Sequence, residues 1–471
     1  MAQPPRTGAV VLAAGGGTRL KSDLPKVLHP AAGRPLLAHV LAALAPLELV
    51  GVVVVASTRR AEIEDAMAAE GLSDGVAYTV QDPPRGTADA LRVGLDAVAG
   101  ACDEVVVVPG DAPLLEASTL ARLVALRRAS GAAGAMLTAS VHEPAGYGRV
   151  VRGDGDLVER VVEDRDATPQ QRRIHEVNGG VYTFDVARVA PLLAKVDRDN
   201  AQGEYYLTDV VALLRGQDER VVALETHADE IAGVNDRAQL AFVSGLMRHR
   251  VCERWMAEGV SIVDPRTTYI DTTVVIERDA TIHPFTFLEG STSVAAGAEV
   301  GPQARVVDSE IAEGATVSFA LVRSSRVGPE ASVGPFASLR PGTVLERGSR
   351  IGTFVESKNA TLGEDSKANH LAYLGDASIG RGVNVGAGTI TCNWDGRAKH
   401  ATVIDDDAYI GSDTMLVAPV RVGRRAATGA GSVVRDDVPD DALAVGVPAR
   451  VIENAGNRME RTGADDENPR Q

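Results

Sequence analysis

Residues 10–20 read Val10-Val11-Leu12-Ala13-Ala14-Gly15-Gly16-Gly17-Thr18-Arg19-Leu20, and Pro25-Lys26 follows shortly after. An apolar run that ends in glycines is typical of a strand buried on both faces of a sheet. Backbone N–H groups of a glycine loop after such a strand can bind an anion, and Arg19 and Lys26 add positive charge beside it. The stretch therefore predicts a phosphate-binding loop in an α/β domain. By itself this is weak evidence, because many α/β folds have a glycine-rich turn there and bind no phosphate.

Strands and helices alternate through the first part of the chain. Such alternation indicates a mostly parallel, Rossmann-like sheet covered on both sides, whose ligands bind at the carboxyl ends of the strands. Arg19, Lys26, Asp111 and Asn235 all follow predicted strand ends, so we expect them on one rim. The Asp111 carboxylate is a ligand suited to Mg²⁺. The predicted strands include 8–14, 51–56 and 104–108, and the predicted helices include 36–47, 60–70 and 88–98.

A six-residue repeat begins beyond about residue 260. Aliphatic residues recur at every sixth position and are often followed by glycine, as in Val300-Gly301 and Ile351-Gly352. This period is typical of hexapeptide repeats that form a left-handed parallel β-helix, with each aliphatic side chain pointing into a coil of three short strands. The unbroken runs are Ile276, Ile282, Leu288, Val294, Val300 and Val306, then Val327, Val333, Leu339, Leu345 and Ile351, then Ile404, Ile410, Leu416 and Val422.

The repeat is interrupted near 354–373 and again near 391–403. Interruptions of this kind usually form loops on one face, often the binding face. A histidine there could accept the proton of an attacking amine, although a lone histidine is more often a hydrogen-bonded surface residue. A β-helix can also serve only as an assembly scaffold. The reactive side chains in the two segments are His370, Tyr373, Asn393, Trp394 and Lys399.

Composition limits the possible partners of the chain. The formal net charge of −16 disfavours a nucleic-acid partner, which would require a basic surface. Three widely separated cysteines show no metal-binding spacing and indicate a reduced, cytoplasmic setting. No apolar stretch reaches membrane-spanning length, and the first residues do not resemble a signal peptide. We therefore expect a cytoplasmic protein that binds neither nucleic acid nor membrane.

The 471 residues are too many for one ordinary domain. We expect an α/β domain over 1–235 and a linker helix over 236–259, a stretch in which Gly245 is the lone helix-breaking residue before Gly259. The β-helix should then occupy 260–455. The polar, charged residues 456–471 predict a disordered tail.

The motifs of the first domain follow one another in a specific order. They are Leu12-Ala13-Ala14-Gly15-x-Gly17-Thr18-Arg19, Pro25-Lys26, Gln81, Gly86-Thr87-Ala88, Gly110-Asp111, Gly146-Tyr147-Gly148-Arg149, Glu163, Asn178, Gln202-Gly203-Glu204-Tyr205-Tyr206-Leu207-Thr208-Asp209 and Gly233-Val234-Asn235. This series resembles the signature of sugar-nucleotide pyrophosphorylases. Over residues 8 to about 452 the chain is most similar to the bacterial family of bifunctional N-acetylglucosamine-1-phosphate uridylyltransferases and glucosamine-1-phosphate acetyltransferases, which combine this domain with a hexapeptide β-helix.

The resemblance implies roles for the first-domain residues. Arg19 and Lys26 would neutralise the phosphates of UTP as catalytic residues, and Asp111 and Asn235 would hold Mg²⁺. Pro109 stands where some relatives carry Tyr, and Gly16 where some carry Lys. The implied substrate-binding residues are Leu12, Ala13, Ala14, Gly15, Gly86 and Thr87 for the uridine, Gly148, Glu163 and Asn178 for the sugar, and Gln81, Pro109 and Gly110 in addition.

The resemblance also implies a second site, in the β-helix. His370 would be the general base on the amine of glucosamine-1-phosphate. Relatives in this family assemble as homotrimers with acetyl-CoA bound between subunits, so a homotrimer is expected here. The other implied residues are Arg340 and Lys358 for the sugar phosphate, Tyr373 and Asn384 for the sugar, and Ala387, Asn393, Trp394, Ser412 and Ala430 for acetyl-CoA.

The whole pattern predicts an enzyme that acetylates glucosamine-1-phosphate and then joins the product to UMP. Its products would be pyrophosphate and UDP-N-acetylglucosamine, a precursor of cell-wall polysaccharide. One alternative is a nucleotidyltransferase for another sugar-1-phosphate whose β-helix only assembles the oligomer, but His370 and the Asn393-Trp394 segment argue against it. Another is a regulatory scaffold without catalysis, which would not need Arg19, Lys26 and Asp111 together.

Overall fold

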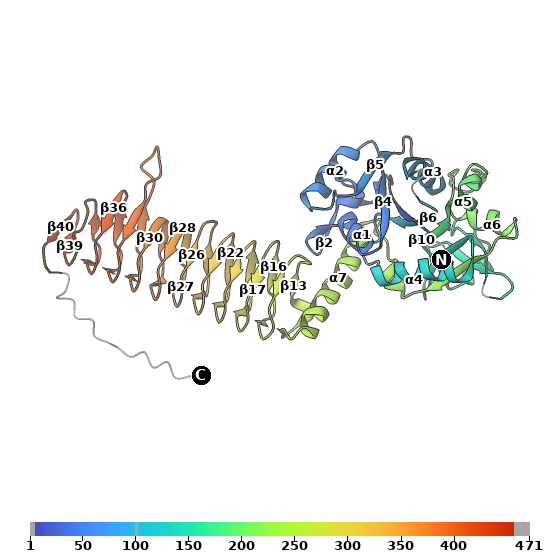
Figure 1. The fold of residues 1–471 in the computed structure, drawn as a ribbon. Coiled ribbons are helices and arrows are strands. Elements are labelled where there is room, and N and C mark those ends of the chain that lie inside the picture. The colour runs from blue at the N-terminus through green and yellow to red at the C-terminus, as the bar shows by residue number, and fades with distance from the viewer. Residues whose placement is uncertain (1–4, 99–101, 156, 456–471) are drawn as a thin grey trace. The chain divides into compact units, whose positions relative to one another are not determined.

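The computed structural model describes residues 5–98, 102–155 and 157–455 (Figure 1). The chain divides into two compact units between Met247 and Arg248. Each unit has its own hydrophobic core. The tail predicted at 456–471 lies outside the described residues.

A nine-stranded sheet forms the centre of the first unit, with a main path in the order β11-β7-β10-β6-β1-β4-β5. Strands β6, β1, β4 and β5 run parallel, which confirms the predicted Rossmann-like sheet. Strand β10 is antiparallel to both of its neighbours, β6 and β7. The strands are β1 Thr7–Ala13, β4 Leu49–Ala56, β5 Val76–Val80, β6 Glu104–Pro109, β7 Gly134–Ser140, β8 Arg149–Arg152, β9 Val158–Val162, β10 Glu176–Asp185 and β11 Val221–Glu225, and a small hairpin joins β2 Pro30–Ala31 to β3 Arg34–Pro35.

Helices cover both faces of this sheet because alternate residues of each buried strand point to opposite sides. In β1, Val11 packs in a core with α1, α2 and α4, whereas Val10 packs in the other core with α3, α5 and α6. Both faces are therefore shielded, and ligands are left to bind at the ends of the strands. The helices are α1 Leu36–Leu44, α2 Arg60–Ala69, α3 Thr87–Val98, α4 Ala117–Ser130, α5 Val186–Leu193, α6 Asp209–Arg215 and α7 Arg237–Ala257.

The second unit is a parallel β-helix of stacked coils, as the six-residue repeat predicts (Figure 1). One sheet of 12 strands starts at β12 Ser261–Ile262 and ends with the hairpin of β39 Leu443–Gly446 and β40 Ala449–Ile452. A second sheet of 17 strands runs from β13 Tyr269–Ile270 to β38 Val433–Val434. The aliphatic residues of the repeat, such as Val300 and Ile410, are fully buried along the axis.

The two expected interruptions of the repeat differ in structure. Residues 354–373 do not form a loop, which corrects the expectation, because this segment holds the strands β28 and β29. Ile351 pairs with Ala368, 17 residues on, whereas Val333 pairs with Ile351, 18 residues on, so a coil one residue shorter shifts the repeat without leaving the helix. The strands here are β27 Arg350–Thr353, β28 Glu356–Leu362, β29 Lys367–His370, β30 Tyr373–Ile379 and β31 Asn384–Val385.

The interruption at 391–403 is a true insertion. Strand β32 Ile390–Cys392 and strand β33 Thr402–Ile404 flank it, and Trp394 pairs with Lys399 in an antiparallel bridge. Because of this hairpin, Val385 and its partner Ile410 are 25 residues apart. In Figure 1 the hairpin projects beyond the stacked coils near β36 (Val420–Val422).

Helix α7 forms where the linker helix is predicted, and the division between the two units falls inside it. Val243 and Met247 belong to a core cluster of the first unit. Val251, Cys252 and Trp255 belong to the core of the second. The N-terminal half of α7 thus belongs to the first unit, and the C-terminal half belongs to the second.

Candidate active sites

The glycine loop follows β1 and presents open backbone. Gly15 and Gly16 are exposed, and a Cβ at either position would meet nothing within 4 Å. Gly17 differs, because its φ is 57° and a Cβ there would lie 2.9 Å from the Cβ of Lys26. The loop can therefore approach an anion closely while its last glycine packs against the residue that supplies a positive charge.

Lys26, Asp111 and Asn235 meet at the carboxyl-end rim of the sheet, as predicted. The Lys26 Nζ donates to Asn235 Oδ1 at 2.8 Å and forms an ion pair with Asp111 Oδ2. Both ends of the ion pair are largely buried, with 13% and 18% of their side chains exposed. Lys26 and Asn235 are 209 residues apart in the chain. Two oxygen donors thus converge on one cation, which is the arrangement that a bound metal ion would require.

Two adjoining hollows open at this rim. Gly15, Gly16, Pro109, Asp111, Glu163 and Asn178 line both of them. The loop-side hollow also includes Arg19, Lys26, Gly148 and Asn235. The helix-side hollow, at the start of α3, also includes Leu12, Ala14, Gln81, Gly86 and Thr87.

Ala13 and Gly110 lie buried behind the wall of these hollows. The Gly110 N–H donates to the Leu12 carbonyl at 2.9 Å, which holds the ends of β1 and β6 together. A Cβ at Gly110 would lie 3.3 Å from that carbonyl oxygen, so the wall is tight here. The structure therefore places these two predicted residues in a supporting position.

Glu163 is held by Thr208, which lies in the 202–209 motif but is not among the predicted site residues. The Thr208 hydroxyl, in the wall of the helix-side hollow, donates to Glu163 Oε1 at 3.0 Å. Burial raises the pKa of Glu163, while this hydrogen bond opposes the rise. Asn178 Oδ1 accepts from the Gly180 N–H at 2.9 Å, which fixes the orientation of its side-chain amide. Gln239, which accepts from the Asn235 N–H at 2.7 Å, is a second residue of the hollow that sequence reasoning missed.

Gln81 fixes the turn at the start of α3. Its Nε2 donates to the Gly86 carbonyl at 3.0 Å and to Asp89 Oδ2 at 2.8 Å. Gly86 has a φ of 121°, and a Cβ there would lie 2.5 Å from the Tyr205 carbonyl oxygen. A glycine is required at this position for both reasons.

We expect Gly86→Ala to destabilise the first unit by about 2 kcal/mol or more, because the new methyl group clashes with Tyr205 backbone and the φ is strained. Calorimetry of the whole protein measures the change. Gly71→Ala is the matched control, since Gly71 has a φ of 70° but no atom within 4 Å of its Cβ position. Equal destabilisation by both variants would contradict the role of the Tyr205 contact.

In the second unit, four predicted residues lie at one corner of successive coils. Strand register places His370 beside Thr353, and the pairings of the following coils continue the column through Ala387, Ser412 and Ala430. His370, Ser412 and Ala430 are exposed. The corner thus presents an imidazole at one end of a column of small residues, which leaves room for a long, thin ligand.

A cationic group lies on the neighbouring coils. Arg340 and Lys358 stand next to each other in the ladder, and the ammonium of Lys399, with Arg340, lowers the pKa of Lys358. Arg340 Nη1 also donates to Glu356 Oε1 at 2.7 Å, and Glu356 is not among the predicted site residues. Positive charges held this close favour an anion between them. Lys399 thereby joins the two cations predicted to hold a phosphate.

Asp376 ties the hairpin to the coils. Its carboxylate accepts from Asn359 Nδ2 at 2.7 Å and from Asn393 Nδ2 at 2.6 Å. Burial would raise the pKa of Asp376, but these hydrogen bonds and the nearby lysines outweigh it and lower the pKa. Asn393 is buried and Trp394 is exposed. The conformation of the hairpin is therefore fixed at its base, with the indole of Trp394 free to contact a ligand.

Tyr373 and Asn384 occupy different sides of the coils. The Tyr373 hydroxyl lies near Gly375 and Asn393, since a Cβ on Gly375 would be 2.4 Å from that oxygen. Asn384 pairs in register with Lys367 and Tyr409, three positions before the corner column. Tyr373 thus lies beside the hairpin, whereas Asn384 lies three positions before the corner column in its coil.

Comparison with known proteins finds relatives whose similarity spans both units. A family model described as a MobA-like NTP transferase domain matches residues 9–181. The bifunctional protein GlmU of Brevibacillus brevis is 45% identical over 97% of this chain and 98% of its own length. GlmU of Streptomyces coelicolor is 47% identical over 93% and 91%, and GlmU of Mycobacterium marinum is 46% identical over 95% and 92%.

The chain belongs to the GlmU family. It is therefore a bifunctional enzyme with uridylyltransferase and acetyltransferase activities, which confirms the activity predicted from the motifs. Its substrates include a nucleotide and a sugar phosphate, as in other GlmU proteins. Among the described residues, no helix is long and apolar enough to cross a membrane.

Proposed function

We propose that the first unit transfers UMP from UTP to N-acetylglucosamine-1-phosphate, with release of pyrophosphate and with Mg²⁺ held at Asp111 and Asn235. The observation that carries this proposal is the convergence of both oxygens on the Lys26 ammonium. Within the described residues, no group of three or more His, Cys, Asp or Glu forms a closed metal site. Mg²⁺ fits a site of one carboxylate and one amide oxygen, because it usually keeps several water and phosphate ligands. When bound, it would neutralise charge that develops on the phosphates.

The protein residues around the metal position bind and orient the two substrates. The N–H groups of the Gly15–Arg19 loop, with Arg19 and Lys26, bind the triphosphate in the loop-side hollow. The helix-side hollow, which Gln81 and Gly86 shape, binds the uridine. Glu163, Asn178 and Gly148 bind the sugar. The reaction needs these groups chiefly for positioning and charge neutralisation.

The second unit would acetylate glucosamine-1-phosphate with acetyl-CoA as donor. The sugar phosphate binds Arg340, Lys358 and Lys399, and Tyr373 and Asn384 orient the sugar. His370 accepts a proton from the amine as it attacks the thioester. Acetyl-CoA lies along Ala387, Ser412 and Ala430, with Asn393 and Trp394 of the hairpin beside it. The corner column supports this path, since small side chains leave the space that a thin chain needs.

The test of the first activity is direct. The protein is supplied with UTP, N-acetylglucosamine-1-phosphate and Mg²⁺, and pyrophosphate and the sugar nucleotide are detected together. Glucose-1-phosphate is added as a competitor. We expect UDP-N-acetylglucosamine as the main product, whereas preferential use of glucose-1-phosphate would favour a pyrophosphorylase for another sugar.

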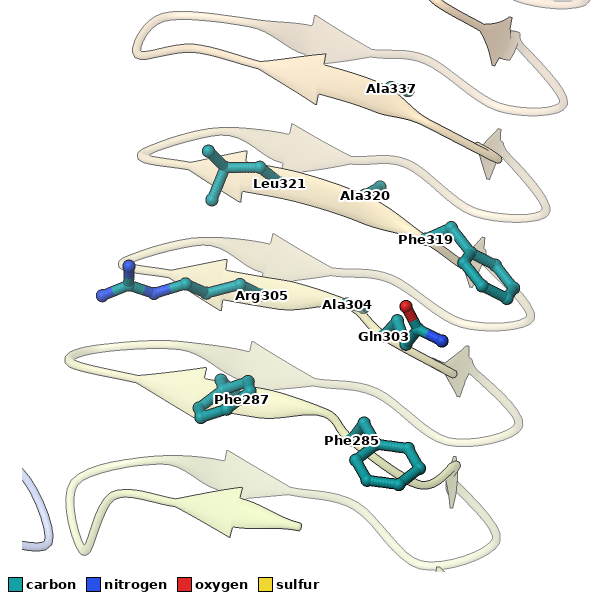
Figure 2. Close-up of a pocket in the computed structure, with 9 residues that line it drawn as sticks. All are labelled: Phe285, Phe287, Gln303, Ala304, Arg305, Phe319, Ala320, Leu321 and Ala337. Carbon is teal, nitrogen blue, oxygen red and sulfur yellow. The ribbon is translucent and has the colours of Figure 1, made fainter. Parts of the chain in front are cut away.

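A homotrimer is also part of the proposed function, and an exposed apolar ladder on the β-helix supports it. Phe336 and Phe354 are 57% and 60% exposed, and their rings stack 5.7 Å apart. Both have positive φ, which is costly for a bulky residue. Figure 2 shows Phe285 and Phe319 on the same edge of earlier coils. Leu371, at the next step, is 60% exposed and adjoins His370, so the ladder reaches the acetyl-transfer corner.

We expect the double variant Phe336→Ser, Phe354→Ser to shift the protein from trimer toward monomer, because it removes apolar surface that burial between subunits would stabilise. Light scattering after size exclusion measures the mass. The matched control is Val275→Ser, at a position 58% exposed on another part of the coils. An unchanged mass for the double variant would contradict the ladder as subunit contact.

The domain limits follow from the same proposal. The residues assigned to substrates and metal in uridylyl transfer precede 236, and only Gln239, which holds Asn235, follows it. The segment 1–235 would therefore carry that activity, and 260–455 would carry acetyl transfer. Residues 236–259, which include α7, would connect the two.

A further inference from the structure

Lys26 contacts the two atoms that the proposed function assigns to the metal. Its Nζ lies 2.8 Å from Asn235 Oδ1 and is paired with Asp111 Oδ2. An ammonium and a divalent cation cannot both contact the same two oxygens, because like charges at such short range repel strongly and this pocket is largely buried. The Lys26 ammonium therefore competes with a metal ion for Asn235 Oδ1 and Asp111 Oδ2.

Hydrogen bonds hold the main chain at Asp111 and Asn235, the residues that supply the two oxygens. The Val234 N–H donates to the Asp111 carbonyl at 3.0 Å, which joins the two segments next to the donor atoms. Asn235 is held through its own N–H by Gln239 Oε1 at 2.7 Å, and the Gln239 N–H donates in turn to Asp236 Oδ1 at 2.8 Å. Because the main chain beside both oxygens is held, movement of the long Lys26 side chain is the simplest way to exchange one cation for another.

The Lys26 side chain also faces a second possible anion site, at the glycine loop. Lys26 and the Gly15–Arg19 loop line the same loop-side hollow, and Gly15 and Gly16 leave that loop open. A triphosphate bound at the loop would bring several negative charges within reach of the long Lys26 side chain. The main chain of Lys26 is packed against Gly17, so the side chain can move while the backbone stays in place.

We propose that Lys26 acts as an internal cation that closes the metal site until nucleotide phosphates draw its ammonium away. The proposal rests on the proposed function, because it takes Asp111 and Asn235 as the metal oxygens. It gives Lys26 a role in the free enzyme that is separate from phosphate binding. Metal alone then binds weakly, since it must displace an ion pair, and metal and nucleotide bind cooperatively because each favours the same lysine position.

Direct metal binding tests this role without measuring activity. Mn²⁺ serves as the probe, and its binding to the whole protein without nucleotide is measured by electron paramagnetic resonance. We expect Lys26→Met to bind Mn²⁺ at least about tenfold more tightly than wild type, because the competing charge is gone. Lys26→Arg, which keeps the charge, should bind as weakly as wild type. Lys21→Met is the matched control, because Lys21 is exposed on the same loop and its charge is screened by solvent.

The outcomes distinguish the role proposed for Lys26 from the metal site on which it rests. Tighter Mn²⁺ binding by Lys26→Met that is lost again in Lys26→Met, Asp111→Asn supports both. If Asp111→Asn weakens Mn²⁺ binding but Lys26→Met leaves it unchanged, the metal site stands and the role of Lys26 as a competing cation is wrong. If Mn²⁺ binding is the same in all variants, the metal site is wrong as well. Equal tightening by Lys21→Met and Lys26→Met would also overturn the proposal, because net charge alone would then explain the effect. Circular dichroism confirms that each variant is folded.

Discussion

Asp111→Ala is expected to abolish uridylyl transfer and to leave acetyl transfer intact. Its carboxylate lies in the loop-side hollow and already pairs with a cation. A metal held there would stabilise the charge of the reacting phosphates by several kcal/mol, and roughly 4 kcal/mol corresponds to a thousandfold loss of rate. Pyrophosphate release, measured over a range of Mg²⁺ concentrations, gives the loss.

The control for this variant is Asp103→Ala, at the opposite end of β6 from Asp111. Asp103, just before the other end of β6, is exposed and pairs with Arg6 at the surface. An exposed ion pair of this kind contributes about 0–1 kcal/mol to stability, so Asp103→Ala should retain nearly full activity. Activity of Asp111→Ala close to that of wild type at limiting Mg²⁺ would contradict the assignment of Asp111 to the metal.

His370→Ala is expected to lower acetyl transfer by roughly 10²–10⁴-fold, the usual contribution of a positioned general base. The amine of glucosamine-1-phosphate is mostly protonated at neutral pH and must lose a proton as it attacks. The loss should appear in kcat rather than KM, because Arg340 and Lys358 still bind the phosphate. Thiol release from acetyl-CoA measures the rate between about pH 5 and 8, where an imidazole changes its charge.

The matched control is His283→Ala, on a coil far from the corner column, which should leave the rate unchanged. Uridylyl transfer should be the same in both histidine variants. If His370→Ala kept a rate within about threefold of wild type with an unaltered pH profile, His370 would not be the base. Tyr373, or a water held by the nearby backbone, would then be the next candidate.

The sequence predicts the buried strands and the stacked coils well because each has a strong period. Val10 to Ala13 and Val105 to Val108 are apolar throughout, and such runs form the centre of a parallel sheet. The direction of β10 could not be predicted, since a strand has the same periodicity in either direction. The strands in 354–373 could not be predicted for a related reason, because a coil shorter by one residue breaks the repeat as a loop would.

The features of the two sites that the sequence does not predict are contacts between residues far apart in the chain. Motif order indicates that Lys26, Asp111 and Asn235 share a rim, but not that the ammonium contacts both oxygens. Lys399 becomes a neighbour of Lys358 only because the 393–400 hairpin folds back through the Trp394–Lys399 bridge. Neither contact could be derived from spacing along the chain.

One measurement tests the central claim, that one chain carries two separate active sites. Protein is given glucosamine-1-phosphate, acetyl-CoA, UTP and Mg²⁺, and UDP-N-acetylglucosamine is detected by mass spectrometry. Asp111→Ala alone should accumulate N-acetylglucosamine-1-phosphate, and His370→Ala alone should leave the amine unacetylated. An equal mixture of the two variants should restore the final product, because each supplies the step that the other lacks. A mixture that remains inactive, with both variants folded, would contradict the account.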